Sequence, residues 1–366
     1  MPNAQSPAPV RLEVHTGSRP STLWIGEGVS QRLASLLDEA AVGGRRFIVS
    51  NPTVWKLHGA ALEHISSAEP ILIPDGERFK TLQTTARIYE ALIRGEADRG
   101  CAIVAIGGGV VGDVGGFAAA TYLRGVTLVQ VPTTLLAQVD SSIGGKVGVN
   151  HQLGKNLIGS FHHASVVAID PLLLTTLPRR EFRSGLYEVV KYGMIASRGL
   201  FDRVALGSKA IFARDPEVLL PAIAESCRIK AEVVAADERE SGLRRVLNYG
   251  HTIGHALEAV TKYRRFRHGE AIAYGMLAAA DLAAARGALR RRERQALADL
   301  IALLGPLPAI NDLSAAQIIE VVRRDKKVVN KRLHFVICIE IGATTIVDDV
   351  TEEELTRVLR SMGLSA

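Results

Sequence analysis

The sequence predicts two domains, an N-terminal α/β domain of the Rossmann-like type and a mainly helical C-terminal domain. Short apolar runs alternate with amphipathic stretches over residues 10–179, which is typical of parallel strands covered by helices on both faces. After Pro178 the apolar residues recur with helical spacing instead. The proline and charges of residues 177–182 place the boundary near 178–181. We therefore predict domains at 10–179 and 180–366, after a polar, proline-rich tail over residues 1–9.

The strands of the first domain are predicted from short β-rich, apolar segments with turn residues between them. An opening pair of strands precedes a series in which each strand is followed by a helix or a turn. The predicted strands are residues 11–16, 21–26, 46–50, 70–74, 101–107, 127–132 and 165–170, and the predicted helices are roughly 29–41 and 81–95.

The second domain is predicted from five stretches in which apolar residues share one helical face. These helices are residues 181–196, 216–237, 246–261, 269–289 and 293–305. A late pair of strands, within residues 333–342, is the one break in the helical pattern.

Composition excludes several classes of protein. The chain has 366 residues, of which 47% are hydrophobic and 22% charged, so it can bury sizeable cores and is not disordered. Its net charge of +6 suits anionic substrates. Its three cysteines show no CxxC spacing, and the N-terminus lacks the features of a secretory signal. The longest apolar stretch is interrupted by glycines and Asp113, so we expect a cytoplasmic protein without a membrane span.

A glycine-rich turn follows the predicted strand 101–107. Gly107, Gly109 and Gly112 fit the pattern GxGxxG at the start of a helix, where backbone amides can approach a pyrophosphate. No Asp or Glu stands about twenty residues later to bind a ribose. A bound dinucleotide would therefore need another ribose contact, and a purely structural glycine turn remains open as the alternative.

A second glycine cluster, over residues 139–150, resembles a phosphate-binding P-loop at Gly145 and Lys146. Asp140 occupies the position of the first P-loop glycine, and Val147 replaces the Ser/Thr that would meet magnesium. This excludes a P-loop nucleotidase. A group of polar residues remains on a flexible, glycine-lined stretch: Asp140, Lys146, Lys155 and Asn156. They indicate a binding segment, with a solvated loop as the alternative.

Three histidines fall close together in the second domain. His251 and His255 lie four residues apart on one helix face, and His268 follows. Thr252 replaces the glutamate of an HExxH zinc protease, which excludes that class. Together with Glu188, two histidines would form a site with open coordination positions for substrate hydroxyl groups. The spacing does not say which two histidines bind, and a structural histidine pair is the alternative.

Basic residues in the predicted helices, or at their edges, stand beside small or apolar neighbours. Each alone is most simply a solvated helix face, but together they indicate a pocket for a phosphate and a carboxylate. They are Lys191, Lys230, Arg244 and Lys327, to which Lys146 and Lys155 are added.

Taken jointly, these motifs resemble the 3-dehydroquinate synthase family. The segments that carry the resemblance occur in the expected order over about residues 10–340. They are DGERFK (75–80), GGGVVGD (107–113), FAAATYLRGV (117–126), QVPTTLLAQVDSSIGGKVGVN (130–150), LGKNLIGSF (153–161), REFRSGLYEVVKYG (180–193), LNYGHTIGHALE (247–258), HGEAIAYGM (268–276) and DKK (325–327).

The resemblance implies an NAD-binding N-terminal domain, a helical metal-binding C-terminal domain, an active site in the cleft between them and a homodimer. It implies that Glu188, His251 and His268 bind one divalent metal ion, usually zinc and in some relatives cobalt, while His255 faces the substrate.

Further site residues are implied by the same resemblance. Glu77 would supply the ribose carboxylate, and Lys326 is the alternative to Lys327. The implied cofactor contacts are Asn51, Asp75, Gly76, Glu77, Lys80, Gly107, Gly108, Gly109, Val110, Gly112, Asp113, Thr133, Thr134, Lys146, Lys155 and Thr176. The implied substrate and catalytic contacts are Arg124, Asp140, Lys146, Lys155, Asn156, Lys191, Lys230, Arg244, Asn248, His255 and Lys327.

The implied substrate is a phosphorylated sugar acid, 3-deoxy-D-arabino-heptulosonate 7-phosphate. Transient oxidation by NAD at C5, loss of phosphate, re-reduction, ring opening and an internal aldol closure would give 3-dehydroquinate. Either the substrate phosphate or His255 would remove the C6 proton. The alternatives are another sugar phosphate cyclase or a metal-dependent alcohol or glycerol dehydrogenase. Nucleic-acid binding is disfavoured because no basic patch with interleaved aromatic residues is present.

Overall fold

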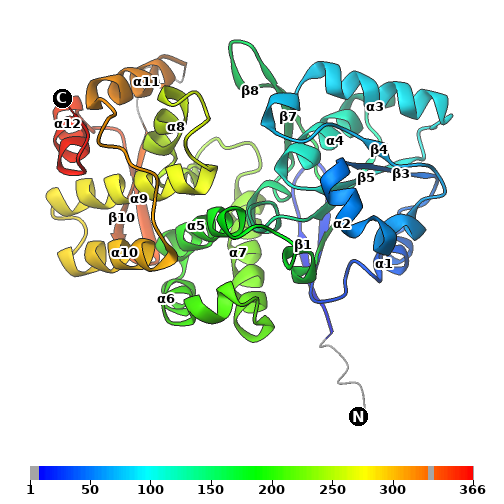
Figure 1. Cartoon of the computed structure of the whole chain (residues 1–366), viewed down its shortest axis with the longest axis horizontal. Helices are drawn as coiled ribbons and strands as arrows, with labels where there is room; N and C mark the ends of the chain where they lie inside the picture. The colour runs from blue at the N-terminus through cyan, green and yellow to red at the C-terminus, as the bar shows by residue number, and fades with distance from the viewer. Residues whose placement is uncertain (1–7, 329–333, 366) are drawn as a thin grey trace. The chain divides into compact units, whose positions relative to one another are not determined.

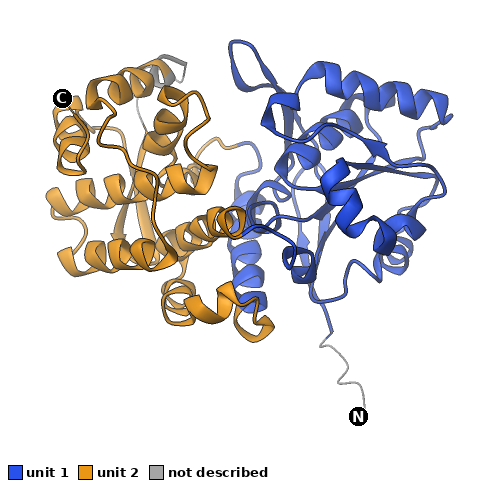
Figure 2. Ribbon diagram, viewed as in Figure 1, with its two compact units in different colours: residues 1–178, 219–239 blue, residues 179–218, 240–366 orange. Residues whose placement is uncertain are grey.

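The computed structural model describes residues 8–328 and 334–365, except for the side chains of residues 325–328. The chain forms two compact units, which Figure 2 distinguishes by colour. Unit 1 comprises residues 1–178 and 219–239, and unit 2 comprises residues 179–218 and 240–366. Each unit is considered by itself below.

Unit 1 is built on a mixed seven-stranded sheet in the order β1-β2-β9-β6-β5-β3-β4, of which Figure 1 labels β1, β3, β4 and β5. The opening pair β1–β2 is antiparallel, and the other pairings are parallel. The strands are β1 (Val10–Val14), β2 (Ser21–Ile25), β3 (Arg46–Ser50), β4 (Ile71–Leu72), β5 (Ala102–Gly107), β6 (Thr127–Pro132) and β9 (Val166–Ile169). All seven predicted strands are therefore present.

Helices cover both faces of this sheet, as apolar strands without alternation require. On one face, α1 (Leu33–Glu39) contributes Leu33 and Leu37 to a core that also contains alternate residues of β5 and β6. On the other face lies α4 (Gly109–Thr121), whose Gly115 approaches Ala105 of β5 so closely that an added Cβ would be 3.2 Å from its Cβ. The remaining helices of this part are α2 (Pro52–Leu62) and α3 (Leu82–Arg94), with short helical turns η1 (Glu63–Ile65), η2 (Glu77–Phe79), η3 (Tyr122–Arg124), η4 (Ala137–Ser141) and η5 (Pro171–Leu174).

The glycine-lined stretch, for which the sequence analysis predicted no strands, forms an antiparallel hairpin. It consists of β7 (Lys146–His151) and β8 (Gly154–Phe161). Gly148 pairs with Gly159, and a Cβ on either glycine would lie within 2.6 Å of a backbone carbonyl oxygen of the other strand. The glycines therefore allow close strand pairing at this point.

The helix α7 (Pro216–Ala236) joins unit 1 through most of its length, although the sequence assigned all of it to the second domain. Its polar contacts explain the difference. Cys227 contacts the backbone carbonyl of Gln138 at 3.4 Å, and Lys230 bonds to Asp140. Just beyond the helix, Glu238 lies 3.2 Å from the ring nitrogen Nε2 of His163.

In the described part of unit 2, helices predominate, and β10 (Phe335–Glu340) and β11 (Ala343–Val347) form a hairpin. The sequence pattern predicted four of these helices but missed α6, α11 and α12. It placed both strands of the late pair within residues 333–342, where only β10 lies, so the position of the second strand was wrong. The helices are α5 (Arg179–Ala196), α6 (Arg198–Phe212), α8 (His251–Val260), α9 (His268–Ala285), α10 (Arg291–Leu304), α11 (Ala315–Val328) and α12 (Glu352–Ser361), with the turn η6 (Leu243–Asn248) before α8.

Two glycines let the central helices of unit 2 approach one another closely. A Cβ on Gly269, at the start of α9, would lie 1.9 Å from the carbonyl oxygen of Ser184 in α5. A Cβ on Gly275 would lie 1.8 Å from the carbonyl oxygen of Gly250, which precedes α8. These contacts are with backbone atoms, so any side chain would force the helices apart.

The C-terminal helix α12 is tied to the end of α9 by an ion pair. Arg286 donates two hydrogen bonds of 2.7 Å to Glu354, which also caps α12 through Thr351. These contacts lower the pKa of Glu354 to about 2.

This shift predicts acid-sensitive stabilisation of α12. Since the pKa is lowered on folding, the contribution is complete above the unfolded value of about 4.3 and disappears as the pH falls towards 2. We expect Glu354→Gln to lower the free energy of unfolding at pH 7 by about 1–3 kcal/mol. Denaturant unfolding at pH 7 and at pH 2 measures this. A difference from wild type that stays constant over this range would contradict the prediction.

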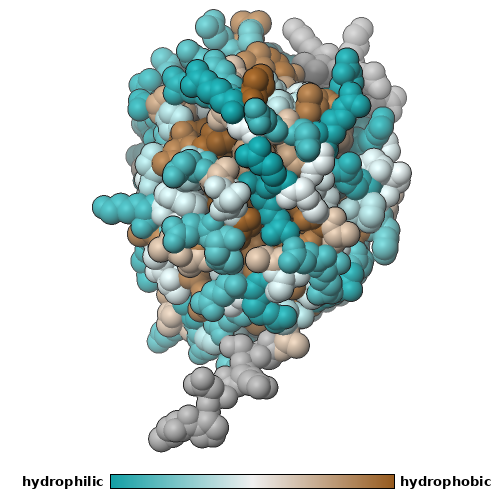
Figure 3. Space-filling view, turned by 90° about the vertical axis from the view of Figure 1, so that its right-hand side faces the viewer, coloured by the Kyte–Doolittle hydropathy of each residue, from teal (hydrophilic) through white to brown (hydrophobic). Residues whose placement is uncertain are grey.

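Several large hydrophobic residues of unit 1 are exposed. They include Leu57, Leu72, Leu82 and Ile93. In Figure 3, some brown residues adjoin one another at the upper left of the visible face, and others are set singly among teal and white ones. Among the residues that the structure describes, we find no helix with the length and hydropathy needed to cross a membrane.

Candidate functional site

The cofactor residues implied by the sequence gather at one edge of the unit 1 sheet. Asn51 follows β3, Asp75 follows β4, and Thr133 follows β6. The glycine turn follows β5, and Thr176 comes shortly after β9. Because the carboxyl ends of neighbouring parallel strands share an edge, the topology brings these residues together. The order in which strands are added to the sheet reverses after β4, because β4 and β5 lie on opposite sides of β3. Open α/β sheets bind their ligands at such a switch point.

The glycine turn between β5 and α4, termed the anion cradle below, could receive an anion at the start of the helix. Gly108 is the N-cap of α4 and provides no side-chain cap, while Gly109 and Val110 are partly exposed. The first-turn amides, at the positive end of a helix of 13 residues, can therefore receive an anionic ligand. A Cβ on Gly107 would lie 2.6 Å from Val111, and one on Gly112 would lie 2.8 Å from Gln130 Oε1.

A buried lysine connects this turn to the hairpin. Lys80 bonds to the carboxylate of Asp113 in α4, and its Nζ donates to Asn156 Oδ1 at 2.6 Å. Burial raises the pKa of Asp113 to about 6, although Lys80 opposes the shift. The positive charge of Lys80 is thus held at the edge of the anion cradle.

Two further contacts join the segment 75–80 to the hairpin. Glu77 Oε1 accepts a hydrogen bond from Asn150 Nδ2 at 2.9 Å and lies 3.6 Å from Lys155 Nζ. Asn150 Oδ1 accepts from the backbone N–H of Asn156 at 3.0 Å. Asn150 was not among the predicted residues, because a neutral amide in a glycine-rich segment carries no distinctive signal.

Asp140 and Lys230 form a partly buried ion pair in unit 1. Lys230 Nζ donates to the backbone carbonyl of Asp140 at 2.6 Å and to its Oδ1 at 2.7 Å. The side chain of Lys230 is 7% exposed and that of Asp140 is 23% exposed. The pair fixes the turn η4 that leads towards Lys146.

We expect Lys230→Met to lower the free energy of unfolding by about 2–3 kcal/mol. Methionine fills a similar volume but cannot donate to the Asp140 carboxylate and carbonyl. The substitution therefore removes one partner of an ion pair that is only partly buried, which costs less than the same loss in a fully buried pair. Denaturant unfolding measures the effect. The exposed Lys209→Met is the matched control and should change stability by less than about 0.5 kcal/mol. Equal effects of the two substitutions would contradict a structural role for the pair.

Unit 2 brings Glu188 of α5 together with histidines of α8 and α9. Glu188 Oε1 lies 3.7 Å from His251 Nε2 and 3.5 Å from His268 Nε2. Nitrogen and oxygen ligands of a tetrahedral zinc ion are about 3.4 Å apart, given bond lengths of about 2.0–2.1 Å. His255 belongs to the same cluster, since ligand atoms of the three histidines lie within 4.8 Å of one another.

The second ring nitrogens of two of these histidines are also engaged. His251 Nδ1 lies 3.2 Å from the carbonyl oxygen of Tyr249, and His268 Nδ1 lies 3.4 Å from Glu258 Oε2. In each ring the other nitrogen, Nε2, faces Glu188. These residues therefore fit a metal ion that contacts Nε2 of both rings and the Glu188 carboxylate.

The surroundings of the cluster shift the pKa values of His251 and His268 in opposite directions. Burial alone would lower the pKa of His268, but Glu188 and Glu258 raise it to about 10. At His251, burial and the neighbouring Lys191 lower the pKa well below its ordinary value. Lys191 Nζ contacts Glu188 Oε2 at 2.5 Å. A neutral His251 suits metal binding, because a metal ion requires the unprotonated ring nitrogen.

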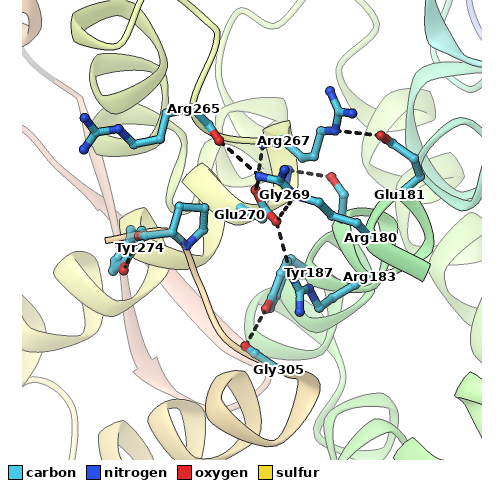
Figure 4. A network of polar contacts seen from close by, with 12 residues as sticks. Arg180, Glu181, Arg183, Tyr187, Arg265, Arg267, Gly269, Glu270, Tyr274 and Gly305 are labelled. Atoms are coloured by element: carbon cyan, nitrogen blue, oxygen red, sulfur yellow. Dashed lines mark hydrogen bonds and ion pairs between the residues drawn. The ribbon is translucent and has the colours of Figure 1, made fainter. Parts of the chain in front are cut away.

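The start of α9, which carries His268, is anchored by Glu270 (Figure 4). This fully buried carboxylate accepts hydrogen bonds of 2.8 and 2.7 Å from Arg180, and of 3.2 Å from Arg183. It also accepts from the backbone N–H of Arg267 at 2.8 Å. Both arginines belong to α5, the helix of Glu188, so the network joins α5 to α9, the helix of His268.

The other predicted residues are distributed as follows. Arg244 is buried at η6, Asn248 donates to Glu240 at 2.8 Å, and Arg124 has a positive φ of 70°. Lys326 and Lys327 fall within α11, but their side chains lie outside the described residues. Unit 1 contains Asn51, Asp75, Gly76, Glu77, Lys80, Gly107, Gly108, Gly109, Val110, Gly112, Asp113, Arg124, Thr133, Thr134, Asp140, Lys146, Lys155, Asn156, Thr176 and Lys230. Unit 2 contains Glu188, Lys191, Arg244, Asn248, His251, His255, His268 and Lys327.

This fold and these clusters are typical of an enzyme class that combines an α/β unit, whose sheet edge could bind a nucleotide, with a helical unit that could hold a metal ion. Residues 70–184 match the 3-dehydroquinate synthase N-terminal family, and residues 185–328 match the 3-dehydroquinate synthase C-terminal family. A 3-dehydroquinate synthase from Citrifermentans bemidjiense is 46% identical over 338 residues, covering 91% of this chain and 93% of the relative. The chain belongs to the 3-dehydroquinate synthase family.

Solved structures agree with this assignment of the fold. The 2-epi-5-epi-valiolone synthase ValA from Streptomyces hygroscopicus, solved with NAD⁺ and Zn²⁺, matches with a TM-score of 0.84 at 28% identity. The match covers 91% of this chain and 94% of ValA. A 2-deoxy-scyllo-inosose synthase complexed with carbaglucose-6-phosphate, NAD⁺ and Co²⁺ matches with a TM-score of 0.84 at 26% identity, covering 96% of this chain and 100% of that one.

Proposed function

We propose that this protein is a 3-dehydroquinate synthase that converts 3-deoxy-D-arabino-heptulosonate 7-phosphate into 3-dehydroquinate and phosphate. The observation that carries the proposal is the convergence of Glu188 Oε1 with the Nε2 atoms of His251 and His268, in a chain of this family. NAD and one divalent ion, zinc or cobalt, are the proposed cofactors. Family membership disfavours a net dehydrogenase.

Glu188, His251 and His268 are the proposed metal ligands. Both histidines hold their Nδ1 atoms against acceptors and direct Nε2 at the carboxylate. A carboxylate and two neutral imidazoles leave a net charge of about +1 and open coordination positions. When bound, the ion lowers the pKa of a substrate hydroxyl group. His255, which lies on α8 together with His251, is proposed to face the substrate.

NAD is proposed to bind at the carboxyl edge of the unit 1 sheet. The amides of Gly109 and Val110 at the start of α4 would hold its pyrophosphate, and Asp75 or Glu77 would bind ribose hydroxyl groups. When bound there, NAD would supply reversible hydride transfer with the substrate and would be unchanged overall. Lys80 supports this edge by fixing Asp113 and the hairpin.

Basic and amide side chains are proposed to bind the two anionic ends of the substrate. Lys146, Asn248, His255 and Lys327 would hold the phosphate, with Arg124 contributed by the partner of a homodimer. Lys230 and Arg244 would bind the carboxylate and sugar oxygens, together with Lys155, Asn156, Lys191 and Asp140. Arginine and lysine suit these roles because they donate several charge-assisted hydrogen bonds. The C6 proton would pass to the bound phosphate or to His255.

The test is incubation of the NAD- and metal-loaded protein with the heptulosonate phosphate. We expect release of inorganic phosphate and an equal amount of the carbocyclic product, without net absorbance change at about 340 nm, because the hydride is returned. A heptulose 7-phosphate that lacks the carboxylate and glucose 6-phosphate serve as control substrates. Turnover of a control substrate but not of the heptulosonate would identify a different sugar phosphate cyclase. Stoichiometric NADH would identify a dehydrogenase.

A further inference from the structure

Glu258 is a buried carboxylate that none of the proposed catalytic roles uses. It lies on α8, seven residues after His251, and is 6% exposed. Carboxylates are almost never this buried without a hydrogen-bonding or charged partner. Its Oε2 lies 3.4 Å from Nδ1 of His268, which belongs to a different helix, α9.

His268 is therefore held between two carboxylates, one at each ring nitrogen. Its Nε2 lies 3.5 Å from Glu188 Oε1, and its Nδ1 faces Glu258. A neutral imidazole carries a proton on one nitrogen only. When that proton lies on Nδ1 and is donated to Glu258, the lone pair of Nε2 is left for a metal ion.

His251 provides an internal comparison. Its Nδ1 also has an acceptor, but that acceptor is the backbone carbonyl of Tyr249 at 3.2 Å. The orientation of His251 is thus set by the chain itself and survives any side-chain substitution at position 249. The orientation of His268 depends instead on the side chain of Glu258, so it can be changed by one substitution.

We infer that Glu258 is a positioning residue for the metal site. It selects the Nδ1–H tautomer of His268, fixes the plane of the ring and adds negative charge near the ion. The inference rests on the proposed function, because it assumes that His268 binds the metal through Nε2. It makes Glu258 a determinant of metal affinity although Glu258 does not contact the ion.

The experiment measures metal affinity rather than turnover. Zn²⁺ dissociation constants of the full-length wild type, Glu258→Gln and Glu258→Met are obtained by competition with a chromophoric chelator. Loss of such outer contacts weakens metal affinity by about 10–100-fold. For Glu258→Gln, whose amide oxygen still accepts from Nδ1–H, we expect Zn²⁺ affinity to weaken by about tenfold. For Glu258→Met, which has a similar volume and no such acceptor, we expect it to weaken by about a hundredfold.

Controls separate a positioning role from general damage to the fold. Glu293→Gln removes another buried carboxylate of unit 2, on α10. Because Glu293 belongs to a different helix from every residue of the cluster, its Zn²⁺ affinity should stay within about twofold of the wild-type value. Metal-free Glu258→Gln should bind NAD like the wild type, and its Co²⁺-loaded form should show a shifted visible spectrum. Equal Zn²⁺ affinity of wild type and both Glu258 variants would overturn the inference. A wild type that binds no Zn²⁺ would instead overturn the proposed function.

Discussion

Replacement of His268 by alanine is expected to abolish stoichiometric metal binding and to lower turnover at least about a thousandfold. A divalent ion contributes several kcal/mol of charge stabilisation, and each 1.4 kcal/mol is about a factor of ten in rate. NAD affinity should be largely retained, because the proposed cofactor residues all belong to unit 1. Elemental analysis of the purified variant, NAD titration by fluorescence and phosphate-release kinetics measure the three quantities. A variant with normal metal content and rate would contradict the assignment of His268 as a ligand.

Two further variants distinguish the possible ligand sets of the cluster. If Glu188, His251 and His268 bind the ion, Glu188→Gln should lose it, whereas His255→Ala should retain it and lose turnover. If instead the three histidines bind the ion, His255→Ala should lose it and Glu188→Gln should retain it. Metal content alone therefore decides between the two sets, independently of activity.

The second large effect is expected at Glu270. Glu270→Ala removes the buried acceptor shared by Arg180, Arg183 and the backbone N–H of Arg267. Removing one partner of a buried ion pair typically costs about 3–5 kcal/mol, and here the charge left in a poorly solvated position is that of Arg183, whose side chain is 15% exposed. We expect a loss of this size in the free energy of unfolding, measured by denaturant titration with the metal removed.

Glu181→Gln is the matched control for this prediction. Glu181 belongs to the same group of contacts in Figure 4 and pairs with Arg267 at 2.6 Å, but both side chains are well exposed. Exposed pairs contribute about 0–1 kcal/mol. A loss at Glu270 no larger than the loss at Glu181 would show that burial does not strengthen this network.

Much of the α/β unit could be predicted because its strands are continuous apolar runs between glycine, proline and polar residues. The segment 101–107 illustrates this, since all six residues of β5 are buried. The hairpin β7–β8 could not be predicted in this way, because β8 is mostly exposed and its sequence mixes Gly, Lys, Asn and Leu without alternation. Its pairing depends on the contact of Gly148 with Gly159, which are eleven residues apart.

The candidate site was predictable to a different extent in each part. His251 and His255 were detected by their helical spacing, but spacing alone left the choice of ligands open, since both lie on one face. The side chains of Glu258 and Glu270 were not detected, because a glutamate in an amphipathic helix is most often solvated. Only the packing of α8 and α9 against their neighbours shows that these two carboxylates are buried.

The assignment of α7 to unit 1 has a practical consequence for dissection of the protein. The chain leaves unit 1 at Pro178, returns for residues 219–239 and leaves again. A fragment that stops at Pro178 would lack Lys230 and Cys227, and so would lose the partners of η4 that lie on α7. An autonomous nucleotide-binding fragment would therefore need residues 219–239 grafted back through an artificial connection, rather than a single cut of the gene.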